Sequence, residues 1–321
     1  MADSIDTFAR LLAPLGEAEF FADVYHRRPL HVSGSPEKIA DVMSWDSLNH
    51  MLAMDVWDGA TLQLVLDRQR VPPAAYSRTA LNRAQRQIMR PEAGKVLDFL
   101  RRGASLVLNN VETLHAPILA IAEAIGNRIG AKVSANLYCS WPAHQAFDSH
   151  YDRHDVYALH VAGRKDWRVY EGRLEHPIEH AAFYNVPQAE CDRLKGRVAH
   201  ELTLRPGDLL YLPRGQFHDA MASREASIHL TFGCSEPTGL DWLTRLWERA
   251  VHDPAFRVDL PLGAEGAGEA ELRAHLTMLV ERLGRLALDG SEGMDAARAL
   301  RRDFPLARGA YDLPGALPKD S

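Results

Sequence analysis

Residues 205–218 read RPGDLLYLPRGQFH, and this stretch decides the predicted fold. A turn signal at Pro206–Asp208 leads into a short apolar run, Leu209–Leu212, and a second turn signal follows at Pro213–Gly215. Four apolar residues between two turns are typical of a short buried strand. His218 comes where the next strand is expected to begin, so its side chain is a candidate to point toward the axis of a small barrel.

Similar strand-like runs extend over the middle of the chain. They are Val133–Ser140, His150–Val161, Asp166–Tyr170, Ala199–Leu204 and Ser227–Gly233. Several short strands separated by turns predict an all-β barrel or a double-sheet jelly roll. We therefore expect a mainly β fold with flanking helices.

The N-terminal part, residues 1–130, contains segments with the apolar spacing of helices and segments with that of strands. Helical spacing covers Phe8–Tyr25 and Ala116–Ile129, Ser44 is placed to cap another helix, and strands are expected at Pro29–Val32, Thr61–Leu66 and Ala104–Leu108. The segment Ser77–Arg102 is rich in Arg and Gln and is predicted to be a solvated helix and loop rather than a ligand site.

The helical period returns after Pro237. Leu240–Val251 and Glu269–Leu288 carry apolar residues at steps of three and four, and Gly263–Gly268 reads as a linker. These helices are expected to cover the open end of the barrel or to pair with another subunit. The predicted domains are 1–130, 131–236 and 237–321.

Composition limits the class of protein. The chain has 321 residues, 46% hydrophobic and 25% charged, with a net charge of −6, which excludes disordered, collagen-like and coiled-coil classes. The negative balance argues against broad nucleic-acid binding but leaves room for a local basic patch. Three cysteines without CxxC spacing indicate a reducing compartment. With no secretory signal or apolar run of membrane length, the protein is expected to be soluble and cytoplasmic.

His150-Tyr151-Asp152 is the stretch that suggests chemistry. Residues two apart on a strand point to the same face, so this imidazole and carboxylate can bind one metal ion. A third ligand from an opposing strand would complete the two-histidine, one-carboxylate set of non-haem Fe(II) oxygenases. His218 is the candidate for that ligand. Alone, an HxD pattern is weak, because chance produces it on the order of once in a chain with this many histidines.

Lys165 adds a second feature to the same region. It follows His150 by fifteen residues and falls on the neighbouring predicted strand. A buried lysine beside a metal site is costly unless it meets an anion. A dicarboxylate cosubstrate would supply that anion.

Several spaced motifs resemble the JmjC-type ribosomal oxygenases, which belong to the cupin superfamily of Fe(II)- and 2-oxoglutarate-dependent hydroxylases. They are HYDRHDV at 150–156, GRKDWRVY at 163–170 and PGDLLYLPRGQFH at 206–218, with further matches at Phe20–Val32 and Asn136–Tyr138. The similarity covers roughly residues 5 to 250. It implies a double-stranded β-helix (jelly-roll) fold of the JmjC type with a C-terminal helical region.

The resemblance also implies roles for six residues. His150, Asp152 and His218 would bind Fe(II) and form the catalytic centre. Lys165 would pair with the distal carboxylate of 2-oxoglutarate, whose pocket Tyr138 and Asn136 would line. The substrate would be a side chain of a protein or peptide, such as an Arg or His of a ribosomal protein.

The resemblance bears on the C-terminal region as well. Many relatives carry a winged-helix-like domain after the dimerising helices, and with 70 residues following Val251 that domain is expected to be missing or reduced. A homodimer through the C-terminal helices is expected, with no membrane and no direct nucleic-acid partner.

Several alternatives stay open. His154 would touch substrate or be structural, and His229 is interpreted as a hydrogen-bonded core histidine. The same fold could hydroxylate a small peptide or natural-product intermediate. A third hypothesis is a metal-binding but non-catalytic cupin that acts as an interaction module.

Overall fold

The structure is a computed structural model that describes residues 2–82, 84–141, 148–184, 186–222, 225–262, 267–288 and 290–306. It divides into two compact units. The first comprises residues 1–129 and 133–235, and the second comprises residues 130–132 and 236–321. Each unit is described by itself.

The first unit begins with a helical and mixed part. Its elements are α1 (Ala2–Leu12), α2 (Glu17–Glu19), a π-helical turn (Phe20–Val24), β1 (Leu30–Val32), a 3₁₀ turn (Pro36–Ile39), α3 (Trp45–Leu52), β2 (Leu62–Leu66), β3 (Gln69–Arg70), α4 (Pro73–Tyr76), β4 (Ser77–Leu81), β5 (Gln87–Pro91), α5 (Ala93–Arg101), β6 (Ser105–Leu108), a 3₁₀ turn (Val111–Thr113) and α6 (Ala116–Ile129). The predicted cap is confirmed, because the Ser47 amide donates to the Ser44 hydroxyl at 3.1 Å.

The rest of the first unit supplies the strands of the core. They are β7 (Lys132–Ser140), β8 (Asp155–Ala162), β9 (Lys165–Arg173), β10 (Val198–Leu204), β11 (Leu209–Leu212), β12 (Gln216–Ala222) and β13 (Ser227–Ser235), with a 3₁₀ turn (Ala181–Phe183) and α7 (Gln188–Leu194) between β9 and β10.

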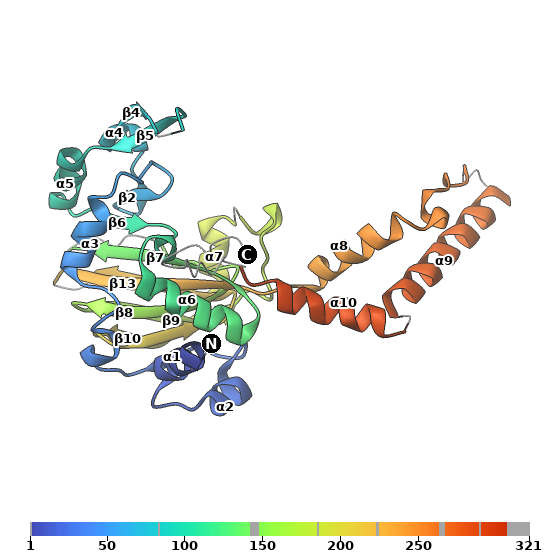
Figure 1. Ribbon diagram of the computed structural model, residues 1–321, viewed down its shortest axis with the longest axis horizontal. Helices are drawn as coiled ribbons and strands as arrows, with labels where there is room; N and C mark the ends of the chain where they lie inside the picture. Colours follow the sequence, from blue (N-terminus) through green and yellow to red (C-terminus); the bar gives the residue numbers. More distant parts are fainter. Residues whose placement is uncertain are drawn as a thin grey trace, which may run out of the picture. The chain divides into compact units, whose positions relative to one another are not determined.

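These strands form two antiparallel sheets. An eight-stranded sheet has the order β1-β11-β8-β13-β7-β6-β2-β3, and a three-stranded sheet has the order β10-β9-β12. In Figure 1, β7, β13 and β8 run side by side, with α6 along the sheet. This arrangement confirms the predicted double-stranded β-helix.

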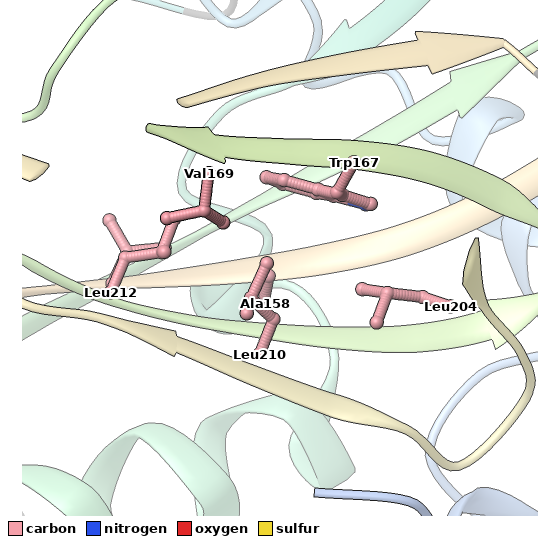
Figure 2. Packing of buried hydrophobic residues seen from close by; sticks show 7 residues of the cluster. Ala158, Trp167, Val169, Leu204, Leu210 and Leu212 are labelled. Carbon is pink, nitrogen blue, oxygen red and sulfur yellow. The ribbon is translucent and has the colours of Figure 1, made fainter. Parts of the chain in front are cut away.

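One apolar cluster joins the two sheets. Figure 2 shows Trp167 and Val169 of β9 facing residues of β8 and β11. The whole cluster consists of Val156, Ala158, Trp167, Val169, Leu204, Leu210 and Leu212, all at most 4% exposed. The buried strand predicted at Leu209–Leu212 is confirmed, because all four of its residues are buried and two of them belong to this cluster.

The turn before that strand explains its PGD sequence. Gly207 has a φ of +94°, and a Cβ atom there would lie 2.1 Å from the Ser35 carbonyl oxygen, so only glycine fits. The Asp208 carboxylate accepts from the amides of Arg205 at 3.0 Å and Gly34 at 2.8 Å. The turn therefore also anchors the N-terminal segment to the sheet.

Three segments differ from the sequence prediction. The helix predicted over Phe8–Tyr25 is interrupted after Leu12, because Pro14 and Gly16 break it. The segment Ser77–Arg102 contains the β4–β5 hairpin in addition to α5. The strand predicted from His150 begins only at Asp155.

The second unit is helical. It contains α8 (Gly239–Ala250), a 3₁₀ turn (Pro254–Arg257), α9 (Ala267–Leu288) and α10 (Gly290–Asp303), and α8 begins with a capping box between Thr238 and Asp241. The expected linker at Gly263–Gly268 lies partly outside the described residues. Among the helices described, none has the length and apolar character needed to span a bilayer.

We predict that Leu210→Ala destabilises the protein by about 2–5 kcal/mol, because Leu210 is fully buried in the cluster between the sheets. Urea unfolding measures the change. Leu81→Ala, at a position that is 57% exposed, is the matched control and should stay within about 0.5 kcal/mol of the parent. Equal losses in the two variants would contradict this account of the core.

Candidate metal centre and cosubstrate pocket

A short backbone pairing brings the two ligand segments together. The His150 amide donates to the His218 carbonyl at 3.0 Å, and the His218 amide donates to the His150 carbonyl at 2.8 Å. Next to this pair, the Gly215 amide donates to the Asp152 carbonyl at 2.8 Å. The HYD motif is therefore irregular chain held against β12 rather than part of a regular strand, because a bend at residues 153–154 separates it from β8.

The structure brings the three predicted metal ligands into one cluster. One ligand atom each of His150, Asp152 and His218 lies within 4.8 Å of the others, and His218 Nε2 lies 3.5 Å from Asp152 Oδ2. The Nδ1 atoms of the two histidines lie 2.8 Å and 3.0 Å from the carbonyl oxygens of Asp148 and Gln216. Because a carbonyl only accepts, each Nδ1 carries the proton and each Nε2 keeps its lone pair.

The charges of this cluster are set by burial and by neighbours. Burial lowers the pKa of His218 to about 4, with His150 adding to the effect, so the His218 ring is neutral near pH 7. Burial alone raises the pKa of Asp152, but His154, His218 and His150 outweigh it and the net pKa is lowered. A neutral imidazole and an ionised carboxylate are the protonation states that bind metal.

Lys165 enters the same pocket from β9. It is 3% exposed, and its Nζ donates to the Ser140 hydroxyl at 3.1 Å. Ser140 also accepts from the Ser105 hydroxyl at 3.1 Å. Burial lowers the pKa of Lys165 to about 8. Within the described part of the chain no carboxylate pairs with this ammonium, so its charge suits an anion that enters the pocket.

Tyr138 and Asn136 both line the pocket from β7, because residues two apart on a strand point to the same face. The Tyr138 ring stacks on His229, with centroids 4.8 Å apart and planes at 8°. Burial raises the pKa of Tyr138 to about 12, so it stays a neutral phenol. Asn136 Oδ1 accepts from the Asn110 amide at 3.2 Å, which fixes the orientation of its side chain.

Two observations refine the interpretation of His229 as a hydrogen-bonded core histidine. His229 is buried but lines the pocket, and its Nδ1 has no hydrogen-bond partner among the described residues. Burial, with Lys165 nearby, lowers its pKa well below the usual value. His154 also lines the pocket, with its ring against the Cα of Gly233, where a Cβ would lie 2.7 Å from His154 Cε1.

The cavity is about 140 Å³ and includes residues that the sequence pattern did not single out, namely Ser134, Val156, Trp167, Ala220, Thr231 and Gly233. Ser140, which bonds Lys165, was not predicted either. The alternation that places Asn136 and Tyr138 on one face also places Ser140 there, so the signal was present. Trp167 follows Lys165 by two residues and stacks on His218, with centroids 5.8 Å apart.

The residues present fit an Fe(II) ion. Two imidazole nitrogens with available lone pairs and one carboxylate form the donor set that is diagnostic of non-haem Fe(II) oxygenases. Both imidazoles are also oriented through Nδ1, as metal-binding histidines are. The buried ammonium of Lys165 in the same cavity matches an anionic cosubstrate.

Comparisons with known proteins agree with this architecture. Residues 112–242 match the JmjC domain. The chain is 27% identical over 298 residues to ribosomal oxygenase 1 of Gallus gallus, covering 91% of this chain and 45% of that protein. It is 26% identical over 305 residues to the bifunctional lysine-specific demethylase and histidyl-hydroxylase NO66 of Drosophila persimilis, covering 88% of this chain and 40% of that protein. The chain thus spans less than half the length of these relatives.

A solved structure shares the fold. The structure of YcfD, a ribosomal oxygenase from Escherichia coli, in complex with cobalt and 2-oxoglutarate superposes with a TM-score of 0.56 at 17% identity, covering 96% of this chain and 76% of that one. The two-sheet core is a cupin fold, and residues 112–242 are similar to the JmjC domain. Over most of its length the chain is similar to ribosomal oxygenases.

Buried neutral histidines predict sensitivity to acid. Burial lowers the pKa of His160 on β8 to about 4, below the unfolded value of 6.5, so the unfolded chain takes up this proton first. Stability from this group is complete above pH 6.5 and is lost as the pH falls toward 4. Between pH 7 and pH 5 the loss is about 2 kcal/mol.

His160→Gln is expected to remove that part of the pH dependence of urea unfolding. The glutamine amide can still donate to the Gly163 carbonyl, which lies 3.0 Å from His160 Nε2. His200→Gln, at an exposed position on β10, is the control and should keep the parent's pH dependence. An unchanged slope in His160→Gln would show that His160 is not a buried neutral group.

Proposed function

We propose that the chain is an Fe(II)- and 2-oxoglutarate-dependent oxygenase that hydroxylates a side chain of a protein or peptide. The observation that carries the proposal is one cavity that contains both the His150, Asp152 and His218 cluster and the buried ammonium of Lys165. A cupin that only bound metal would not need this second feature. The JmjC family match and the likeness to YcfD, which was solved with cobalt and 2-oxoglutarate, support the same chemistry.

His150, Asp152 and His218 would hold the iron. Bound there, the iron would supply the redox chemistry by which O₂ and 2-oxoglutarate are converted to succinate, CO₂ and a hydroxylated substrate. The protein contributes binding, orientation and exclusion of water. Asp152 contributes the negative charge that a divalent cation needs, and Trp167 stacks on His218 and limits movement of its ring.

Lys165 would pair with the distal carboxylate of 2-oxoglutarate. With a pKa of about 8 its amine is mostly protonated at pH 7, and a bound carboxylate would raise that pKa further. The Ser140 hydroxyl holds Nζ in position. Tyr138, a neutral phenol, and Asn136 would contact the same cosubstrate from β7.

The substrate side chain would belong to a protein. The relatives' names, ribosomal oxygenase and histidyl-hydroxylase, support a His residue of a ribosomal protein as the target class, and an Arg residue is the alternative that the sequence resemblance implies. His154, beside Gly233 in the pocket wall, would contact this substrate. Comparative mass spectrometry of ribosomal proteins from cells with and without the gene should show the loss of a one-oxygen mass gain.

The proposed organisation keeps the predicted parts 1–130, 131–236 and 237–321, with the last part forming a homodimer. A single face of α8 supports the dimer, because Leu240, Leu243 and Trp247, and Val251 at the C-cap, are each at least 45% exposed. A cytoplasmic location is supported by the three free cysteines, Cys139, Cys191 and Cys234.

Asp152→Ala is predicted to reduce succinate formation in the presence of Fe(II) by at least about 100-fold, because the metal loses its only anionic ligand from this cluster. His200→Ala, at an exposed position on β10 outside the cluster, should retain the parent rate. Full turnover of 2-oxoglutarate by Asp152→Ala would refute the assignment. Stoichiometric iron with no turnover in the parent would instead favour the non-catalytic cupin.

Lys165→Met is predicted to weaken 2-oxoglutarate binding by about 10- to 100-fold, since a charge-assisted hydrogen bond contributes about 1.5–3 kcal/mol. The free energy of unfolding should not fall, because the variant removes a buried charge and keeps the apolar volume. Titration calorimetry of the Fe(II)-loaded protein without O₂ measures the binding. Lys95→Met, at a half-exposed position, is the control. An unchanged affinity in Lys165→Met would exclude Lys165 as the anchor.

A further inference from the structure

One segment of the chain has a large excess of positive over negative residues. Residues 68–102, called the arginine lobe here, hold nine Lys and Arg residues but only two acidic residues, Glu92 and Asp98. The lobe therefore has a formal charge of +7, whereas the rest of the chain, at a total of −6, has a charge of −13. Figure 1 shows β4, β5, α4 and α5 of this lobe grouped beyond β2, at one end of the large sheet.

The β4–β5 hairpin aligns several of these arginines. Arg78 lies directly opposite Arg90 in the strand register, and the Asn82 amide donates to the Arg86 carbonyl at 2.9 Å at the end of the ladder. Opposite residues share a face, and residues two apart along a strand do too, so Arg78, Arg86 and Arg90 lie on one face. Like charges directly opposite each other are destabilising, and of this pair only Arg90 has a carboxylate partner, Asp55, among the described residues.

The lobe's positive charges differ in their partners. Arg68, Arg90, Lys95 and Arg101 form ion pairs with Asp148, Asp55, Glu92 and Asp98. Arg102 lies over the Phe99 ring. In contrast, Arg70, Arg78 and Arg86 are exposed, and no carboxylate of the described residues lies within ion-pair distance of them. Three guanidinium groups therefore remain available for an external anion.

We propose that the arginine lobe binds the phosphate backbone of RNA. The planar guanidinium matches phosphate oxygens in pairs, and the hairpin adds neutral donors from Asn82, Gln85 and Gln87 beside the arginines. Along the strand, Arg78 and Arg86 are separated by four residues of ladder, about 13 Å, which suits an extended polyanion. An acidic protein with a broad surface would also be repelled by the rest of the chain, whose net charge is −13. The backbone of a single RNA strand is narrow enough to contact the lobe alone.

The lobe adjoins the metal cluster through one ion pair. Arg68 Nη1, at the turn between β2 and β3, lies 2.8 Å from Asp148 Oδ1. The carbonyl of the same Asp148 accepts from His150 Nδ1 at 2.8 Å. The turn that carries Arg68 is thus linked through Asp148 to the segment that carries His150.

The test uses the full chain without metal or cosubstrate, so that it does not depend on the proposed oxygenase activity. Fluorescence anisotropy of a labelled 20-nucleotide oligouridylate measures binding at 50 and 200 mM KCl. With three phosphate contacts to a single strand, the affinity is expected to fall about 15- to 20-fold over this range. The triple variant Arg70→Gln/Arg78→Gln/Arg86→Gln should bind at least about tenfold more weakly at 50 mM.

The matched control is Arg168→Gln/Arg193→Gln/Arg197→Gln, which removes three ion-paired arginines of the same unit outside the lobe, one half-buried and two exposed. It should bind RNA within about twofold of the parent. The lobe variant should unfold at a urea concentration no lower than the parent, because Arg78→Gln relieves a like-charge pair.

Four results would overturn the proposal. The first is no RNA binding by the parent at 50 mM KCl, and the second is an equal loss in both triple variants. The third is competition by poly-glutamate as effective as that by unlabelled oligouridylate at equal charge, which would assign the lobe to acidic proteins. Sedimentation with vesicles of phosphatidylserine is the last arm, and binding to them in place of RNA would likewise exclude the proposal.

Discussion

Two backbone hydrogen bonds between His150 and His218 are the constraint on which the candidate centre depends. They join chain segments 68 residues apart, and each histidine then uses Nδ1 against a carbonyl in its own segment, so that both Nε2 atoms keep their lone pairs in a common space. Asp152 reaches the same space because its carbonyl is tied to Gly215 in the turn before β12. The backbone therefore determines ligand geometry before any metal binds, which is preorganisation in its simplest form.

The same burial that orients these groups also sets their charges. Desolvation disfavours every charged form in the pocket, which makes His218 and His229 neutral and Tyr138 a phenol, while it lowers the pKa of Lys165. The exceptions are Asp152, whose pKa is lowered despite its burial, and Lys165, which stays mostly protonated at neutral pH. The site thus offers one anionic and one cationic point in an otherwise neutral cavity, and each suits one of the two ligands proposed for it.

The sequence allowed much of this to be predicted where one local rule decides the structure. The turns around Leu209–Leu212 and the alternation along Val133–Ser140 are predicted correctly, because buried strands leave a pattern. The HYD segment is predicted as regular strand, since its bend and its pairing to β12 are long-range and leave no periodic signal. The hairpin at Ser77–Pro91 escapes prediction for another reason: its residues are mostly polar and half exposed, so neither face carries an apolar stripe. Tertiary pairing, rather than hydrophobic periodicity, forms those two segments.

Net charge was the least informative of the sequence features, because it averages over regions that a partner meets separately. A net charge of −6 argues against contact with a polyanion only when the charges are spread evenly over the surface. Salt screens the interaction between exposed charges that are more than about 10 Å apart, so the local charge matters more than the total. The lobe at residues 68–102 and the remaining chain differ by twenty charges, so a phosphate on the lobe interacts mainly with Arg70, Arg78 and Arg86.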